Sequence, residues 1–150
     1  MPALLNAERP VTDVPAAPSA EALAHFQKLL AFETDCWDVH VALDARHPGF
    51  VVLDVRSPEA FAAGHVPGAV SLPHRRINEK NLAAHPGDAL FVVYCAGPHC
   101  NGTDKAARRL SELGRKVKVM IGGMTGWADE GYAYAHGDEP GSVVGVDHAA

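Results

Sequence analysis

The sequence predicts an α/β domain built on a parallel sheet. Three short apolar runs rich in β-branched residues support this prediction: Phe50–Leu53, Phe91–Tyr94 and Val117–Ile121. Continuous apolar runs of this length are typical of strands buried on both faces of a parallel sheet. Helical or turn-forming segments separate the runs, and alternation of strands with helices indicates parallel strands joined by crossover connections.

Length, composition and charge exclude several classes of protein. The chain has 150 residues, of which 47% are hydrophobic and 21% charged, and this suits one globular domain with a buried core. Thirteen Lys and Arg against eighteen Asp and Glu leave a net charge of -5, and no basic cluster exceeds a short pair. No apolar run approaches the roughly 20 residues of a membrane span. We therefore expect neither a nucleic-acid partner nor a membrane partner.

The N-terminal residues are expected to form a flexible leader and a first helix. Residues 1–18 hold four prolines among small residues, a composition that does not pack and that breaks helices. They lack the basic start and apolar stretch of a secretory signal, and the three cysteines are too few and odd in number for a disulfide framework. We therefore expect a cytoplasmic protein. Apolar residues at helical spacing predict an amphipathic helix from Ser19 to about Phe32.

Three further segments are expected: a second helix, a fourth strand and a C-terminal tail. A second helix is predicted over residues 36–46, with Trp37 and Val41 on one face. Ala69–Leu72 is a weaker fourth strand. Residues 137–150 show no periodicity, and we expect them to form an extended tail.

The segment after the run Phe91–Tyr94 carries the candidate chemistry. Cys95 opens the stretch Cys-Ala-Gly-Pro-His-Cys-Asn-Gly, and a helix follows with Asn101 or Thr103 as N-cap and Gly114 as its stop. Such a loop directs backbone N–H groups, and the positive end of the helix, at the space above the sulfur. We expect Cys95 to be ionised near neutrality and nucleophilic, and the alternative is a buried cysteine that only packs.

Three segments together resemble the rhodanese family of sulfurtransferases. They are Leu-Asp-Val-Arg-Ser-Pro-Glu-Ala-Phe running into Gly-His-Val-Pro-Gly-Ala, the Tyr94-Cys95 loop with its helix, and Gly-Gly-Met-Thr-Gly-Trp ending at Trp127. The resemblance covers about residues 50–130. It implies a three-layer fold over 19–136, with a parallel central sheet of about five strands and helices on both faces.

The resemblance also implies an activity. Cys95 would take sulfane sulfur from a donor such as thiosulfate or polysulfide and hold it as a persulfide. A small thiol, a protein thiol or cyanide would then accept the outer sulfur, and no cofactor is needed. The resemblance further assigns Asp54 and Arg56 to an ion pair that braces the sheet.

The expected donor-binding residues come from the loop and from one basic turn. The loop lacks the arginine that many family members have near its end, and Pro98 removes one N–H donor. His99 is a candidate proton donor, and Arg75 is a candidate source of the missing positive charge. An exposed histidine and a solvated basic turn are the alternatives. The expected set is Ala96, Gly97, His99, Asn101, Gly102 and Arg75.

Cys100 is the second cysteine of interest. A curled loop of five positions can bring it within disulfide range of Cys95, where it would attack the persulfide or cap an oxidised Cys95. The alternative is a small residue at the helix entrance. A zinc site of Cys95, His99 and Cys100 lacks a fourth ligand, so we expect no metal. Two rival functions stay open: a non-catalytic sulfur-carrier or partner-binding module, and a thiol-redox protein that cycles Cys95 and Cys100 as a disulfide.

Overall fold

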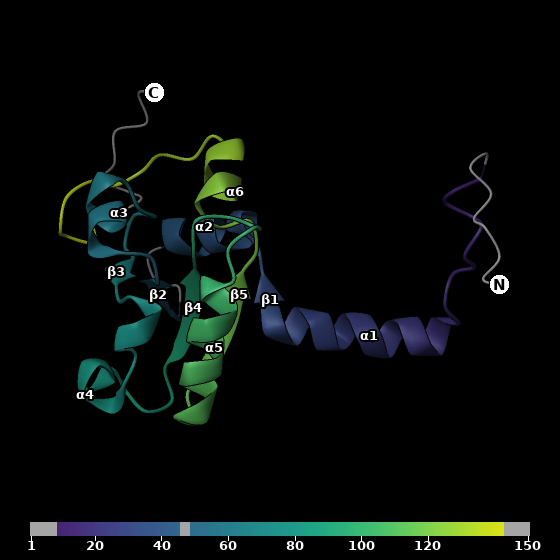
Figure 1. Ribbon diagram of the computed structural model, residues 1–150, viewed down its shortest axis with the longest axis horizontal. Coiled ribbons are helices and arrows are strands. Elements are labelled where there is room, and N and C mark those ends of the chain that lie inside the picture. The colour runs from purple at the N-terminus through teal and green to yellow at the C-terminus, as the bar shows by residue number, and fades with distance from the viewer. Residues whose placement is uncertain (1–8, 46–48, 143–150) are drawn as a thin grey trace. The chain divides into compact units, whose positions relative to one another are not determined.

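The computed structural model describes residues 9–45 and 49–142, and the chain divides into two compact units, Met1–Ala31 and Phe32–Ala150. The first unit contains most of the helix α1 (Ser19–Phe32), at the bounds that the sequence predicts. The second unit holds the sheet and the remaining helices (Figure 1). The candidate site lies in this second unit, so the rest of the description concerns it.

Five parallel strands form one sheet. They are β1 (Glu33–Thr34), β2 (Val51–Asp54), β3 (Val70–Ser71), β4 (Leu90–Tyr94) and β5 (Lys116–Met120). Their order is β1-β5-β4-β2-β3, which places β4 at the centre. All four pairings are parallel, so the predicted α/β fold with about five strands is confirmed. β1 has no counterpart among the predicted strands, because two residues show no periodicity.

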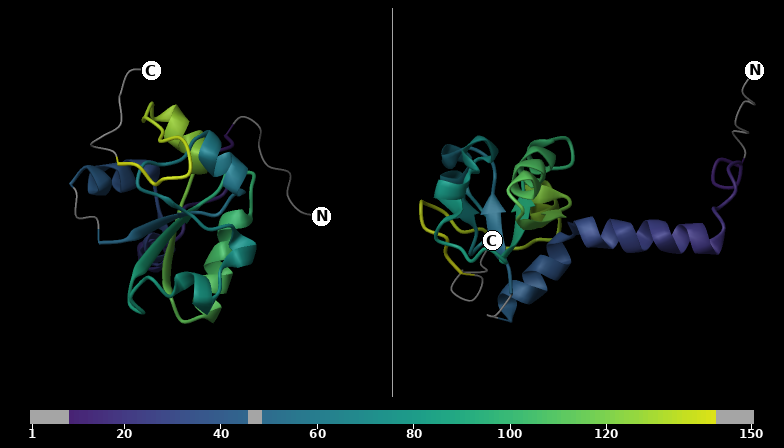
Figure 2. Two further views of the ribbon diagram at one scale, coloured as in Figure 1. Left: turned by 90° about the vertical axis from the view of Figure 1, so that its left-hand side faces the viewer. Right: turned by 90° about the horizontal axis from the view of Figure 1, so that it is seen from below.

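Helices cover both faces of the sheet, so the expected three-layer arrangement is also confirmed (Figure 2). One face packs against α2 (Cys36–Asp44), α3 (Pro58–Ala63) and α6 (Gly123–Asp129). The other face packs against α4 (Glu79–Leu82) and α5 (Gly102–Glu112). A 3₁₀ turn, η1 (His74–Arg76), contacts α5. Alternate residues of the central strands point into the two cores, as the pleat of a strand requires.

The helix α2 presents a different face to the core from the one its large residues suggest. Trp37 and Val41 share one face, as predicted, but they are 60% and 52% exposed. Cys36 and Val39 are buried instead, and they pack beside Trp127 in one core cluster. The helix ends at Asp44, and the end expected near residue 46 lies outside the described residues.

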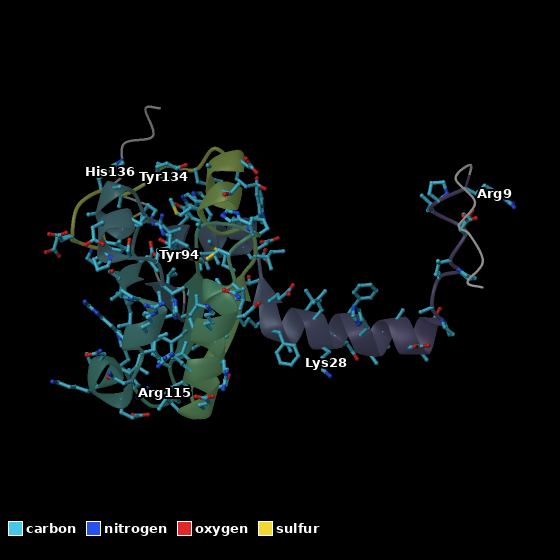
Figure 3. All side chains as sticks on the ribbon, in the orientation of Figure 1. Arg9, Lys28, Tyr94, Arg115, Tyr134 and His136 are labelled. Carbon is cyan, nitrogen blue, oxygen red and sulfur yellow. The ribbon has the colours of Figure 1, made fainter. Side chains whose placement is uncertain are left out.

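The buried carboxylate of Asp54 joins the ends of β2 and β4. It accepts hydrogen bonds from the Arg56 guanidinium, at 2.6 Å from Nη2, and from the Tyr94 hydroxyl at 2.7 Å. The Tyr94 oxygen in turn accepts from the backbone N–H of Val66 at 3.0 Å. Tyr94 is fully buried within the second unit (Figure 3). Its burial, and then the Asp54 charge, hold its pKa far above the ordinary value, so the phenol stays a donor.

The turn after α3 is held by a buried histidine. His65 has its Nδ1 2.8 Å from the carbonyl of Phe61 and its Nε2 3.0 Å from the carbonyl of Pro140. The N–H of Gly137 donates to the carbonyl of Ala62 at 2.9 Å. The chain therefore still contacts the domain beyond residue 136, where we expected the extended tail to begin.

We predict that Tyr94→Phe destabilises the fold by about 1–3 kcal/mol, because it leaves a buried N–H unpaired and removes a donor from a buried carboxylate. Tyr132→Phe is the matched control, since the buried Tyr132 hydroxyl has no hydrogen-bond partner among the described residues. The free energy of unfolding of both variants in denaturant checks the prediction. Equal losses would show that the Asp54 network does not set the stability.

Candidate active site

Cys95 follows the last residue of the central strand β4, at the carboxyl edge of the sheet. Ligands of open parallel sheets bind at this edge, beyond the strand ends. The Cys95 side chain is only 6% exposed. The predicted order of strand, cysteine, loop and helix is confirmed, with α5 beginning at Gly102. Asn101 occupies the N-cap position but makes no side-chain capping bond, and Thr103 lies inside the helix.

The start of α6 forms hydrogen bonds with the loop that begins at Cys95. The backbone N–H of Met124 donates to the carbonyl of Cys95 at 3.1 Å. Thr125 donates to the carbonyl of Ala96 through its backbone N–H, at 3.0 Å, and its Oγ1, at 3.1 Å. Gly123 has a φ of +57°, and a Cβ there would collide with the Cys95 carbonyl oxygen. No local pattern predicts this support, because it joins residues far apart in the chain, although the segment Gly-Gly-Met-Thr-Gly was among those that carried the resemblance.

The loop brings the thiols of Cys95 and Cys100 together. A turn with the N–H of Cys100 bonded to the carbonyl of Gly97, at 3.1 Å, reverses the chain. Both sulfurs border Gly102: a Cβ on this residue would lie 2.9 Å from the Cys95 Sγ and 3.4 Å from the Cys100 Sγ. Each thiol affects the pKa of the other, and both are free. Both sulfurs therefore lie near the same residue, and disulfide range between them stays a prediction.

The pKa of Cys95 is raised, whereas we expected it to be lowered, and it is the pKa of Cys100 that is lowered. Burial raises the pKa of the Cys95 thiol to about 11, and its hydrogen bond to Cys100 acts in the same direction. The pKa of Cys100 is lowered, first by that hydrogen bond and then by the backbone N–H of Gly102. The prediction that Cys95 is ionised near neutrality is therefore wrong. The strand end removes its sulfur from water, and the donor at the helix start lowers the pKa of Cys100 instead.

The other expected binding residues divide into two groups. Of the loop residues, Gly97 packs against Thr125, whereas His99 and Asn101 are exposed. A Cβ on Gly97 would lie 3.3 Å from the ring of His99, so this ring covers the loop backbone. Arg75 lies on η1, in a separate groove that it forms with residues of α5. It is thus not part of the loop's own cradle.

Among the residues that the structure describes, no group of three or more His, Cys, Asp or Glu side chains could hold a metal ion. Within the same residues, no helix combines the length and the apolar character that crossing a membrane demands.

Comparisons with known proteins identify the family. Residues 38–130 match the model of the rhodanese-like domain. The chain is 39% identical over 103 residues to the HTH-type transcriptional regulator Rv0324 of Mycobacterium tuberculosis, covering 64% of this chain and only 45% of the regulator. It is 37% identical over 87 residues to the thiosulfate sulfurtransferase GlpE of Pseudomonas entomophila, covering 57% of this chain and 77% of that enzyme.

A solved structure agrees with these sequence matches. The crystal structure of the BH2092 protein from Bacillus halodurans has a TM-score of 0.77 and 36% identity, over 81% of this chain and 88% of that chain. The match extends over most of each protein. The family match, the relatives and the shared fold lead to one conclusion: this chain belongs to the rhodanese-like domain family.

Proposed function

We propose that the protein is a sulfurtransferase that carries sulfane sulfur as a persulfide on Cys95. The observation that carries this proposal is the pair of free thiols that border Gly102, at the end of the central strand and the start of α5. Relatives named thiosulfate sulfurtransferase, at 37% and 33% identity, support it. No cofactor is required, because the sulfur itself is the nucleophile and the carrier.

In the first step Cys100 acts as the base. Its thiolate, the more acidic member of the pair, takes the proton of Cys95 along their hydrogen bond. The Cys95 thiolate then attacks the outer sulfur of thiosulfate, an S–S bond forms, and the bond within thiosulfate breaks. Sulfite leaves with the electron pair, and Cys95 carries the persulfide. A thiolate of high pKa is the stronger nucleophile once it is formed, which suits the buried sulfur.

In the second step an acceptor removes the outer sulfur. A thiolate attacks it, the S–S bond to Cys95 breaks, and the electron pair returns to the Cys95 sulfur; cyanide would give thiocyanate in the same way. Backbone N–H groups of the loop, including those of Ala96 and Gly102, interact with the two thiols and favour negative charge there. A small thiol or a protein thiol is the acceptor class we propose.

The thiol contact also favours a second candidate, a thiol-redox protein. A two-electron oxidant would join Cys95 and Cys100 in a disulfide, with the loss of two protons, and a reducing thiol would reopen it. A third candidate function is that of a non-catalytic sulfur carrier. It is supported by a relative from Bacillus subtilis, 27% identical, that is named putative sulfur carrier protein. A carrier would load one sulfur and release it slowly, whereas a sulfurtransferase would turn over.

We predict that thiosulfate or polysulfide adds one sulfur to the reduced protein and that cyanide removes it. Cys95→Ser should abolish the adduct, because it removes the attacking sulfur, whereas Cys100→Ser should slow its formation without preventing it. Intact-protein mass spectrometry of the three proteins measures this. The sulfurtransferase proposal fails if neither donor gives an adduct. Loss of two hydrogens that requires both cysteines would favour the redox protein instead.

We predict that the rate of persulfide formation rises with pH and that Cys100→Ser moves this rise to higher pH. In the wild type the lowered pKa of Cys100 sets the rise, because its thiolate is the base. In the variant only Cys95 titrates, and burial holds its pKa well above that of an ordinary thiol. Stopped-flow loading rates across the pH range check this. Superimposable profiles would mean that Cys100 is not the base.

We predict that Gly102→Ala slows sulfur loading at least several-fold with little loss of stability. The new Cβ would stand 2.9 Å from the Cys95 Sγ, so the sulfur must move out of its position beside Cys100. Gly87→Ala is the matched control, since a Cβ there meets nothing within 4 Å. Loading rates and melting temperatures of both variants give the answer. An unchanged loading rate in Gly102→Ala would remove the need for close thiol contact.

A further inference from the structure

An apolar groove lies between α2 and α6, the α2–α6 groove, and the loop that holds the cysteines forms part of its wall. The two helices pack against each other, so the groove belongs to the folded domain. Its volume is about 430 Å³. The apolar side chains that line it are Cys36, Trp37, Pro98 and Ile121.

Two of these side chains are large and remain in contact with water. Trp37 is 60% exposed and Ile121 is 48% exposed. Val41, one turn farther along α2 on the face of Trp37, is 52% exposed. The core does not need them, because Cys36 and Val39 supply the buried contacts of α2. Exposed apolar patches mark interaction sites, and tryptophan is enriched among the residues that dominate the energy of protein interfaces.

The groove adjoins the candidate active site through two segments of the chain. Pro98 is the third residue after Cys95, in the loop between the two cysteines. Ile121, on another part of the wall, comes shortly before Met124, whose backbone N–H donates to the carbonyl of Cys95 at 3.1 Å. A molecule that fills the groove therefore contacts the loop itself and the segment that fixes its conformation.

Three carboxylates give the groove an acidic rim. Asp35 and Glu130 line it, and Asp129 precedes Glu130. All three residues are exposed, and none has an ion pair among the residues that the structure describes. Their charges, after burial, raise the pKa of Cys36, which also lines the groove. Asp129 and Glu130 stand at the C-terminal end of α6, where the helix dipole disfavours negative charge, so helix stability does not explain them.

The combination of an apolar groove and an acidic rim indicates the chemistry of the occupant. An apolar side chain flanked by lysine or arginine would fill the groove and neutralise the rim. A second copy of the chain has a net charge of -5 and the same rim, so like charges would oppose its approach. A small anion such as thiosulfate would be repelled in the same way. The charges therefore favour a basic segment of a different protein.

We propose that the α2–α6 groove binds a basic segment of a partner protein, with an apolar side chain of the segment beside Trp37 and its cations at the acidic rim. This inference rests on the proposed function and names its acceptor: a protein thiol carried next to such a segment. The partner's thiolate attacks the outer sulfur of the Cys95 persulfide, and a new S–S bond forms. The S–S bond to Cys95 breaks, its electron pair returns to the Cys95 sulfur, and the partner leaves as a persulfide.

The first test measures binding without sulfur chemistry. The probe is a fluorescent synthetic peptide in which leucines are flanked by lysines and a serine stands in place of the cysteine. A second peptide has glutamates in place of the lysines, and a third has serines in place of the leucines. Fluorescence anisotropy against the reduced full chain gives the Kd of each peptide.

Two groove variants are compared with matched controls. Trp37→Ala removes the exposed aromatic side chain of the groove. Its control is Phe26→Ala, at an aromatic residue that is 55% exposed and does not line the groove. Glu130→Gln removes one charge of the rim. Its control is Glu59→Gln, the same change at an exposed residue outside the groove.

We expect the wild type to bind the peptide with lysines and leucines more tightly than either of the other two. Trp37→Ala should weaken this binding about tenfold, because it removes a large apolar contact. Glu130→Gln should weaken it about threefold, as the loss of one exposed ion pair does. Both control variants should bind like the wild type. Equal affinity for the three peptides, or equal losses in groove and control variants, would overturn the proposal.

The second test follows transfer of the sulfur. Protein loaded with one sulfur is mixed with the cysteine form of the basic peptide and, separately, with mercaptoethanol. The ratio of the two transfer rate constants cancels any general change at the loop. We expect Trp37→Ala to lower this ratio to the same extent as it lowers the affinity. A ratio that stays constant while binding weakens would overturn the role of the groove in transfer to the acceptor.

The outcomes for the groove and for the proposed function are separate. If thiosulfate or polysulfide loads Cys95 but the peptides bind alike, sulfur transfer stands and the groove proposal fails. If the basic peptide binds through Trp37 but neither donor loads Cys95, the proposed function fails and the groove still binds a basic segment. A wild-type dimer that Trp37→Ala converts to a monomer in sedimentation would assign the groove to a second copy and overturn the proposal.

Discussion

The buried Asp54 carboxylate is the constraint on which the rest of the site depends. A charge removed from water must be paired and fully hydrogen-bonded, or it destabilises the fold by several kcal/mol. Here Arg56 and Tyr94 supply the partners, and Asp54 and Tyr94 stand opposite each other on neighbouring strands. Tyr94 directly precedes Cys95, so the same interaction fixes where the strand ends and where the loop begins.

The loop is thus held on two sides by unrelated parts of the chain. The Asp54 network fixes its strand, and the backbone of α6 fixes the carbonyls of Cys95 and Ala96. This rigidity has a chemical cost, since a well-packed sulfur loses the water that would stabilise its charge. The second cysteine offsets that cost, because it lies farther out and receives the N–H donor at the helix start. Cys95 is the buried thiol and Cys100 is the more acidic one, so the two properties belong to different residues.

The sequence was sufficient to predict four of the five strands and the order of strand, cysteine, loop and helix, since buried strands and the helix after Cys95 leave strong local patterns. It was not sufficient for features that depend on contacts across the fold. The sequence placed Trp37 and Val41 on one face of α2, but their exposure to solvent is set by contacts across the fold. The pKa of Cys95 was misjudged because helix direction is local, whereas burial is set by the whole domain. The basic turn His74–Arg76 was considered by itself, and only folding groups Arg75 with the cations of α5.

The attachment of the loop to α6 has a consequence for protein synthesis. The N–H groups of Met124 and Thr125 that hold the carbonyls of Cys95 and Ala96 are encoded after the whole of β5. Contacts this distant along the chain form late, and a nascent chain emerges from its N-terminus onward. While a ribosome is still translating the codons for β5, the two cysteines have already been made but lack their anchor. The contacts between the start of α6 and the carbonyls of Cys95 and Ala96 can form only after residues 124 and 125 have left the ribosome, so this part of the site is completed late.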